Sequence, residues 1–328
     1  MFFAGTGGSA PTARRALPAV LVRAGGDRLL FDCGEGTQRQ LLRSVGLPDL
    51  DAVFLTHYHA DHWLGLPGLI KTFDLRGRDK PLDVHGPPGL RQLWNSLATV
   101  IGRTRYPLRL HELDRFDEVD FGSYGVQSFP NDHRLAGFGY ALVEDARPGR
   151  FDPDTAVRLG LRPGPDFGRL QAGETVNGVR PEQVIGEARR GRRIVFSGDT
   201  RPCQEVEEHA RGADLLVHEA TFTEAERDRA RETGHSTAAE AARLARDAGV
   251  RLLALTHVSM RHFPRDIRDE ARAVFPNTIV PRDFDAVDVP FPERGEPALA
   301  RARPEHTEGE PPDGGGDGQD AGATSPVS

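Results

Sequence analysis

Short apolar runs rich in β-branched and aromatic residues recur along the chain, separated by polar or glycine-containing segments. Runs of this length, bounded by turn residues, predict buried strands. We expect strands at 19–24, 28–33, 52–56, 82–86, 125–130, 138–143, 193–199, 214–220 and 251–257. The pattern therefore predicts a core built mainly from sheet.

Four other segments have a helical pattern. In TAAEAARLARDAG, residues 237–249, apolar residues recur at intervals of three and four, as on one face of an amphipathic helix. The other predicted helices are 36–45, 89–101 and 265–275. Strands come first and regular alternation of strand and helix appears only late, which favours a layered α/β sandwich over a simple doubly wound sheet.

The C-terminal segment differs in composition from the rest of the chain. Residues 295–328 are rich in Gly, Pro, Asp and Glu and contain almost no large apolar side chain, so we expect a disordered acidic tail. Residues 282–328 carry 11 acidic residues and four arginines, which accounts for the whole net charge of −7. Residues 1–281 are therefore about neutral, and binding to a polyanion would depend on local basic patches.

Composition also narrows the class of protein. With 328 residues, 38% of them hydrophobic, the chain can form one large domain or two ordinary ones. No apolar run approaches the ~20 residues needed to span a bilayer, and MFFAGTGG lacks the features of a signal peptide. With only Cys33 and Cys203, a disulfide framework is not expected, and we predict a cytoplasmic protein that does not engage a membrane.

One long segment breaks the strand pattern. Residues 144–191 are rich in Arg, Pro and Gly, and residues 144–193 carry ten arginines against eight acidic residues. We interpret this segment as a mildly positive excursion from the core. From local sequence alone, an ordinary long loop is an equal alternative.

The densest polar cluster follows the predicted strand 52–56. The sequence HYHADH places three histidines and an aspartate within six residues: His57, His59, Asp61 and His62. In an extended segment His57 and His59 point to the same side, whereas the other two follow as the chain turns. Imidazole and carboxylate are ligands that zinc takes, and burying so many imidazoles unpaired would be costly. The cluster therefore predicts ligands for two neighbouring metal ions.

Three more titratable residues lie at or just after the ends of predicted strands and can complete the ligand sets. They are His133, Asp199 and His257. Two metals about 3.5–4 Å apart can stabilise an in-line attack on phosphorus. A single histidine is more often structural than a ligand, so we expect structural or surface roles for the histidines that lack this context: His85, His111, His209, His262 and His306.

A further group of residues could supply a proton to a leaving group. His218 and Glu219 end the predicted strand 214–220, and His235 stands just before the predicted helix 237–249. A glutamate hydrogen-bonded to a histidine raises its basicity, and such a pair could protonate a leaving alcohol. A histidine that merely packs on a loop at the start of the helix is an equally weighted alternative.

Taken in order, the motifs THYHADH, FGY, SGDT, HEATF, GHST and LTH resemble the metallo-β-lactamase superfamily and, more narrowly, the ribonuclease Z family. FDCGEGTQRQLL, residues 31–42, is also similar, and the likeness covers roughly residues 3–290. It implies an αββα four-layer sandwich over residues 1–294, from which residues 144–191 protrude as a flexible arm. It also implies a zinc-dependent endoribonuclease that removes the 3′ trailer from precursor tRNA, leaving a 3′-hydroxyl on the tRNA and a 5′-phosphate on the trailer.

The resemblance further implies roles for individual residues and a partner. The implied ligands are His57, His59 and His133 for one zinc, and Asp61, His62 and His257 for the other, with Asp199 bridging the two. Asp61 would orient or deprotonate the attacking water, and His235 with Glu219 would help the 3′-oxygen leave. The family is typically homodimeric, with the arm of one subunit serving the active site of the other.

Two segments relate to tRNA recognition in this family. LRPGPDFG, residues 161–168, is similar to the Gly–Pro-rich tip of the arm that grips the tRNA elbow, where arginines would contact phosphates. Many relatives carry Pro-x-Lys-x-Arg-Asn near the N-terminus, whereas this chain has PTARRA. Pro11 and Arg15 match, but Ala13 and Ala16 do not. Because that loop is associated with sensing the tRNA 3′ end, discrimination against mature CCA ends is not implied here.

Two alternatives stay open from the sequence. A hydrolase of small phosphodiesters or sulfate esters would need the same metal cluster but not the arm. A metal-binding RNA scaffold without turnover would not need Asp61 or a second metal site, because a structural zinc is usually closed by four protein ligands.

Overall fold

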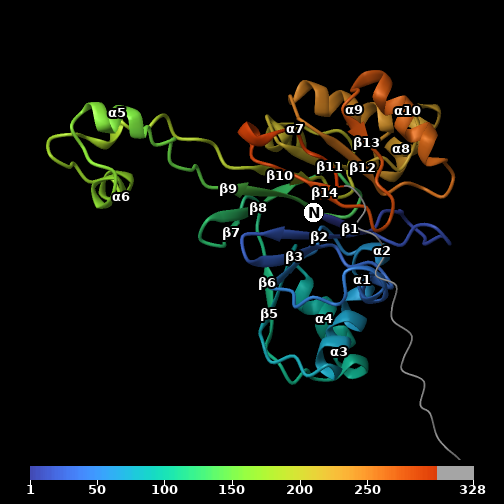
Figure 1. Cartoon of the computed structure of the whole chain (residues 1–328). Coiled ribbons are helices and arrows are strands. Elements are labelled where there is room, and N and C mark those ends of the chain that lie inside the picture. Colours follow the sequence, from blue (N-terminus) through green and yellow to red (C-terminus); the bar gives the residue numbers. More distant parts are fainter. Residues whose placement is uncertain (301–328) are drawn as a thin grey trace, which may run out of the picture.

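Two β-sheets pack face to face in the centre of the molecule, and helices cover the outer face of each (Figure 1). The computed structural model describes residues 1–300. On one outer face lie α1 (Thr37–Ser44), α3 (Gly65–Leu75) and α4 (Leu90–Ile101), and on the other lie α7 (Gln204–Ala210), α9 (Ala238–Asp247) and α10 (Pro264–Val274). The layers run helix, sheet, sheet, helix, so the predicted αββα sandwich is confirmed.

Both sheets are mixed. The first has the order β1-β2-β3-β4-β5-β6, antiparallel from β1 to β3 and parallel from β3 to β6. Its strands are β1 (Phe2–Gly5), β2 (Ala19–Ala24), β3 (Asp27–Phe31), β4 (Ala52–Phe54), β5 (Leu82–Gly86) and β6 (Leu108–Glu112). The second has the order β13-β12-β11-β10-β9-β8-β7, parallel from β13 to β10 and antiparallel from β10 to β7. Its strands are β7 (Glu118–Asp120), β8 (Tyr124–Pro130), β9 (Phe138–Glu144), β10 (Arg193–Phe196), β11 (Leu215–Glu219), β12 (Leu253–Thr256) and β13 (Thr278–Ile279).

Strand β2 shows why these residues form sheets that are buried on both faces. Val20 and Val22 pack in the core between the sheets, whereas Ala19 and Leu21 pack in the core beneath the helices. Because successive side chains of a strand point to opposite faces, a strand with two covered faces has a continuous apolar sequence. The predicted strands share that pattern, and all nine are present.

Aromatic side chains fill the space between the two sheets. The ring centroids of Phe31 in β3 and Phe196 in β10 lie 4.0 Å apart. Phe54 in β4 stacks on Phe31 at 5.2 Å and meets Tyr140 in β9 edge-on at 5.3 Å. Such ring contacts add to the free energy gained from buried area. They hold the sheets together next to the strand ends from which the predicted ligands extend.

Helix α9 begins at a capping box. The Thr237 hydroxyl oxygen accepts a hydrogen bond from the Glu240 backbone N–H at 3.2 Å, and the Glu240 carboxylate accepts one from the Thr237 backbone N–H at 3.0 Å. This reciprocal pair satisfies two N–H groups at the start of the helix. It also fixes the start of the helix at Ala238, shortly after His235, in agreement with the predicted helix 237–249.

The sequence pattern misses several short elements and one longer helix. The missed elements include β6, β7, β13, α3, α5 (Pro153–Arg158), α6 (Pro165–Gln171), α7 and α8 (Arg227–Thr233). By contrast, β1 is present where MFFAGTGG predicts a strand that enters a glycine turn, and α2 (Ala60–Trp63) is present where the chain is expected to turn toward a helix. Helix α3 has the sequence GLPGLIKTFDL, in which two glycines and a proline disfavour a helix. Leu66, Leu69 and Phe73 nevertheless bury against the first sheet, so tertiary packing overrides local propensity.

Residues 144–191 protrude from the body, and their outer part forms a small head (Figure 1). The head contains α5 and α6 around an apolar core of its own: Ala156, Leu161, Leu170, Val176, Val179 and Val184. Phe151 and Phe167 pack against this core with their ring centroids 4.8 Å apart. The segment is therefore an excursion with a folded head, and the alternative of an ordinary long loop is wrong.

The predicted C-terminal tail begins at residue 295, but the structure extends further. Ala298 and Leu299 form β15 (Ala298–Leu299), which pairs antiparallel with β14 (Val287–Asp288). Backbone hydrogen bonds thus make residues 295–300 part of the folded chain, whereas the rest of the predicted tail, 301–328, lies outside the described residues. Within residues 1–300, no helix is long and apolar enough to cross a membrane.

Replacing Phe54 by alanine should lower the free energy of unfolding by about 3–5 kcal/mol, because it removes a fully buried ring from between the sheets. Phe116→Ala is the control, since that side chain is 62% exposed and its removal should cost far less. Urea denaturation followed by circular dichroism compares the two variants. Similar losses would mean that the aromatic cluster is not a principal contact between the sheets.

Candidate metal centre and active site

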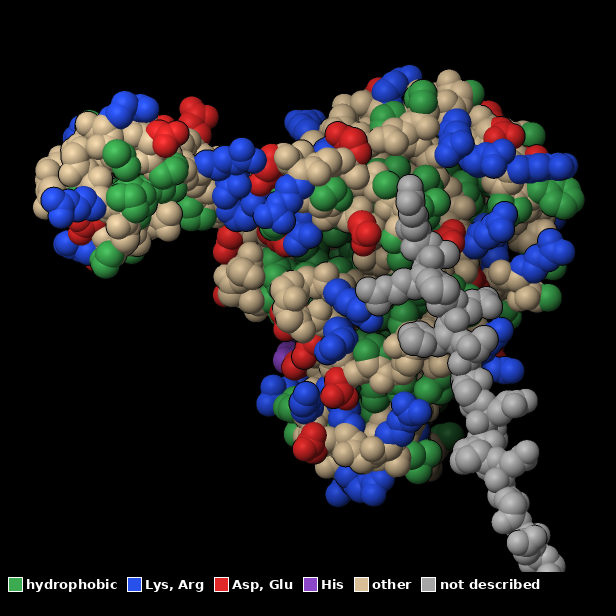
Figure 2. Space-filling view, in the orientation of Figure 1, with side chains coloured by type: hydrophobic (Ala, Val, Ile, Leu, Met, Phe, Trp, Pro, Cys, Tyr) green, Lys and Arg blue, Asp and Glu red, His purple; other side chains and the backbone are tan. Residues whose placement is uncertain are grey.

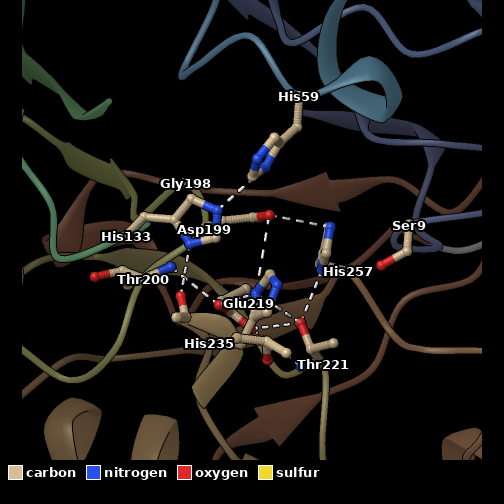
Figure 3. Close-up of polar contacts among 12 residues, drawn as sticks. Ser9, His59, His133, Gly198, Asp199, Thr200, Glu219, Thr221, His235 and His257 are labelled. Atoms are coloured by element: carbon tan, nitrogen blue, oxygen red, sulfur yellow. Dashed lines mark hydrogen bonds and ion pairs between the residues drawn. The ribbon is translucent and has the colours of Figure 1, made fainter. Parts of the chain in front are cut away.

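The seven predicted ligands meet at one edge of the two sheets, where β4, β8, β10 and β12 end. Their donor atoms form groups in which all atoms lie within 4.8 Å of one another: His57, His59, His133 and Asp199 in the first, and Asp61, His62 and His257 in the second. A further group joins Asp199 and His257 to His235. Figure 3 shows several of these side chains pointing toward one another. Four distant stretches of the chain therefore converge as predicted.

Asp199 lies between the two ligand groups. Its Oδ2 atom is 3.3 Å from Nε2 of both His62 and His257 and 3.8 Å from Nε2 of His57. Burial opposes the charge, but the surrounding imidazoles, His257 and His62 foremost, hold the pKa of Asp199 well below its usual range. The carboxylate is therefore ionised and within reach of both groups.

Local backbone structure explains how residues 57–62 contribute to both groups. His57 and His59 lie in the extended loop after β4, with Nε2 of the first 3.0 Å from Nδ1 of the second. Helix α2 starts with His59 as its N-cap, so Asp61 and His62 lie on the helix. The change from extended to helical backbone turns the second pair away from the first.

Three of the rings are held by hydrogen bonds on their other nitrogen. His62 Nδ1 lies 2.8 Å from Asp32 Oδ2, His257 Nδ1 lies 2.8 Å from Thr221 Oγ1, and His133 Nδ1 lies 2.6 Å from the Gly234 carbonyl oxygen. Partners of this kind fix the orientation and tautomer of a ring and leave its remaining nitrogen free for a metal.

Sequence reasoning misses Asp32. Its carboxylate accepts hydrogen bonds from both the backbone N–H and the hydroxyl of Thr56, in addition to the contact with His62. Its backbone has a φ of 57°, a left-handed conformation that is uncommon outside glycine. The signal is present in the sequence, because Asp32 directly follows a buried strand, just as Asp199 follows another.

Asp61 is held by the glycine-containing loop near the N-terminus. The Ser9 backbone N–H donates to Asp61 Oδ2 at 2.7 Å, and the same oxygen lies 3.2 Å from His257 Nε2. Burial opposes the charge, but His257 and His62 hold the pKa of Asp61 well below its usual range. At Gly8, a Cβ atom would lie 2.4 Å from His257 Nδ1, so a larger residue would clash there. The loop thus keeps an ionised carboxylate in one orientation.

The same loop is fixed to the C-terminal part of the body. Arg15 is buried, and its Nη1 donates to Thr6 Oγ1 at 2.5 Å and to the Pro281 carbonyl at 3.0 Å. The Ala16 backbone N–H donates to Asp283 Oδ2 at 2.6 Å. The arginine that matches the family motif is therefore engaged within the fold.

His235 and Glu219 form a hydrogen-bonded pair, with His235 Nδ1 2.8 Å from Glu219 Oε1 (Figure 3). The Glu219 carboxylate also accepts from the Thr200 N–H at 2.9 Å and the Thr221 hydroxyl at 2.6 Å, which fixes its position. Burial opposes the charge on the ring, but Glu219 and Asp199 outweigh it and raise the pKa of His235 to about 9. This environment favours the proton-transfer interpretation over a purely structural histidine.

The histidines expected to be structural make structural contacts. His85 stacks on Phe54, His209 stacks on Phe129, His111 pairs with Asp83, and His262 pairs with Glu226. His218 is buried, with Nδ1 2.7 Å from the Glu219 carbonyl oxygen, and it is absent from the ligand groups found among residues 1–300. His306 lies outside the described residues.

The donor set fits zinc. Burial lowers the pKa of His57, His59 and His133, which favours the neutral imidazole that metal binding requires. His62 Nε2 is buried and has no hydrogen-bond partner within residues 1–300, although the Asp199 Oδ2 atom lies 3.3 Å away. Buried polar atoms without a partner are rare. A cation at this position would satisfy the orphaned nitrogen.

Comparisons with known proteins agree with this geometry. Residues 15–257 match the model of the metallo-beta-lactamase superfamily. The chain is 49% identical over 300 residues to a ribonuclease Z of Haloferax volcanii, covering 88% of this chain and 94% of that one. It is 46% identical over 300 residues to a ribonuclease Z of Myxococcus xanthus, covering 89% and 97%. The crystal structure of the short form of human tRNase Z is similar with a TM-score of 0.66 and 28% identity, covering 88% of this chain and 98% of that one.

These similarities extend over nearly the full length of the relatives instead of a single motif. They agree with the ordered motifs of the sequence and with the two ligand groups of the structure. The chain therefore belongs to the ribonuclease Z family of the metallo-β-lactamase superfamily, a family of hydrolytic endoribonucleases of tRNA 3′ processing.

Proposed function

We propose that the chain is a zinc-dependent endoribonuclease that removes the 3′ trailer from precursor tRNA, with a 3′-hydroxyl left on the tRNA and a 5′-phosphate on the trailer. The observation that carries this proposal is the Asp199 carboxylate between two groups of ligand atoms, with the His235–Glu219 pair beside it. Adjacent metal positions and a proton donor suit hydrolysis of a phosphodiester. Such an enzyme would act in the cytoplasm.

We assign two zinc ions to each subunit. The residues that would hold them are His57, His59 and His133 on one side and Asp61, His62 and His257 on the other, with Asp199 between them. When bound, the ions would supply charge stabilisation at the scissile phosphate. The lowered pKa of His57, which favours its neutral form, and the orphaned nitrogen of His62 support this assignment.

Proton transfers would be divided between Asp61 and His235. Asp61, held by the Ser9 N–H, would orient the attacking water and accept its proton. His235 would donate a proton from Nε2 to the departing 3′-oxygen, while its Nδ1 stays bonded to Glu219. A fixed carboxylate behind the ring would stabilise the charged form until the proton is given up.

We further propose that residues 144–191 bind tRNA away from the metal centre. The head is folded, and Arg158, Arg162 and Arg169 are exposed on it, which suits contacts with phosphates. The arm extends away from its own body, so in a homodimer it could serve the site of the second subunit (Figure 1). A hydrolase of small esters would have no use for such an arm, and the relatives found do not favour that alternative.

Removing the metals with a chelator should abolish cleavage of a precursor tRNA that lacks CCA, and zinc should restore it. The intact protein should cut this substrate immediately after the discriminator base. Elemental analysis should find less zinc in His133→Ala, which loses a ligand of one group only, and an unchanged content in His209→Ala, whose ring stacks on Phe129 instead. Full cleavage by the metal-free protein would contradict the proposal.

Glu219→Gln should slow cleavage of precursor tRNA by roughly 10²–10³-fold, because a neutral amide no longer stabilises the charged form of His235. Hydrolysis of bis(p-nitrophenyl) phosphate should fall far less, since p-nitrophenolate leaves without being protonated. Steady-state kinetics on both substrates, with zinc content as the control, test this difference. Equal losses would mean that Glu219 supports the metal ligands and not the leaving group.

Replacing residues 152–184 by a short Gly–Ser linker should remove the head and leave the body intact, because the Asp152 N–H and the Val184 carbonyl oxygen already lie 2.7 Å apart. The kcat/KM for precursor tRNA should fall by on the order of 10²-fold through lost phosphate contacts. Hydrolysis of bis(p-nitrophenyl) phosphate should be unchanged. A parallel loss on both substrates would show that the head supports folding.

A further inference from the structure

The arm is carried by a stalk of two chain segments. Residues 145–150 leave the end of β9, and residues 186–192 return to the start of β10. Within the stalk, an isolated β-bridge joins Arg147 to Arg189. A two-stranded ribbon is at best marginally stable by itself, so the direction of the arm depends on contacts from elsewhere. Basic side chains gather on the face where the arm leaves the body (Figure 2).

The aromatic ring of Phe291 contacts both segments of the stalk. The guanidinium carbon of Arg147, in the outgoing segment, lies 3.5 Å from the ring centroid, and that of Arg192, in the returning segment, lies 4.5 Å from it. Arg192 also donates to the Val289 carbonyl oxygen at 3.0 Å. A guanidinium over an aromatic face is attracted by the ring electrons, so one side chain joins the two segments.

Glu293 also joins the two segments, through ion pairs. Its Oε1 lies 2.9 Å from Nη2 of Arg147 in the outgoing segment and 3.1 Å from Nη1 of Arg189 in the returning segment. The arginine and glutamate side chains are only 22–34% exposed, so water screens these pairs less than fully exposed ones. We call Phe291 and Glu293 together the stalk clamp.

The segment that carries the stalk clamp is fixed to the body on both sides. Before it, the Val287 N–H donates to the Met1 carbonyl at 2.8 Å, and β14 pairs with β15. After it, Arg251 binds Glu296 at 3.0 Å and the Gly295 carbonyl at 2.6 Å. Arg251 in turn pairs at 2.8 Å with the fully buried carboxylate of Asp214. Because its own segment is bonded to the body, the stalk clamp holds the stalk in a fixed orientation relative to the body.

The stalk clamp and the metal centre lie at opposite ends of the same strands. β10 begins at Arg193, next to the stalk, and ends at Phe196, just before Asp199. β9 ends at Glu144, where the stalk begins. Changes in the clamp therefore leave the loops that carry the ligands untouched.

We infer that Phe291 and Glu293 are positioning residues that set the direction of the arm for precursor tRNA. The inference rests on the tRNA-binding role proposed for the arm. An arm held in place before binding avoids part of the entropy lost on ordering it, so the clamp increases affinity for the tRNA. Neither residue reaches the metal centre, and the chemical step does not depend on them.

Phe291→Ala and Glu293→Gln should each raise the KM for precursor tRNA roughly five- to tenfold. The kcat and the hydrolysis of bis(p-nitrophenyl) phosphate should be unchanged, which also verifies folding and metal content. Phe291→Trp should restore KM, since it keeps an aromatic face under both guanidinium groups. Asp247→Asn, which removes an exposed ion pair with Arg246 at the end of α9, is the control and should leave KM unchanged.

The same substitutions are then made in the protein whose residues 152–184 are replaced by a linker. No further loss there, together with the raised KM in the full chain, supports the inference. A further loss there, or reduced hydrolysis of the small ester, would overturn it, because the residues would then act on the body. An unchanged KM for the clamp variants of the full chain would overturn the positioning role of Phe291 and Glu293, and would leave the proposed tRNA-binding role of the arm in place. If the head replacement itself leaves tRNA cleavage intact, the proposed role of the arm fails, and the inference with it.

Discussion

The buried negative charge of Asp199 is the constraint on which the rest of the structure depends. A carboxylate removed from water is costly unless cations or hydrogen-bond donors surround it. Here two imidazoles approach it to 3.3 Å: His62 from helix α2, which follows β4 of one sheet, and His257 from the end of β12 of the other. They can meet only if the two sheets stack with these strand ends at a common edge. The ring of Phe31 against that of Phe196, 4.0 Å apart, lies in the core that fixes this relation.

A second layer of hydrogen bonds links the ligand groups to the proton-transfer pair. The Thr221 hydroxyl donates to Glu219 Oε2 and can therefore accept from the Nδ1–H of His257. That arrangement fixes the tautomer in which Nε2 of His257 faces Asp61 and Asp199. Glu219 uses its other oxygen to hold His235. A single buried glutamate thus orients a predicted metal ligand through one neighbour and a predicted proton donor directly.

What could be predicted from the sequence is whatever a short stretch encodes locally. Apolar runs specify the nine strands, and the spacing within HYHADH specifies the turn from loop to helix that separates His57 from Asp61. Contacts made across long sequence separations could not be predicted in this way. The Ser9 N–H on Asp61 and the fit of Gly8 against His257 carry no local pattern. Helix α3 likewise forms against its own propensity, because the first sheet buries its apolar face.

Residues 281–293 contact two parts of the chain that the family resemblance associates with tRNA: the N-terminal loop that contains Arg15, and the arm, residues 144–191. Residues 281–283 bind Arg15 and the Ala16 backbone, and so fix the loop whose Ser9 contacts Asp61. Residues 291–293 bind both sides of the stalk. The first contact lies at the active-site edge and the second at the opposite end of β10. In the proposed function, the scissile end of the tRNA binds near the first contact, and the arm binds the tRNA beyond the second. The hydrogen-bonded strands of the second sheet span the distance between the two contacts. Residues 281–293 are therefore positioned to fix both the proposed recognition arm and the loop beside the metal centre.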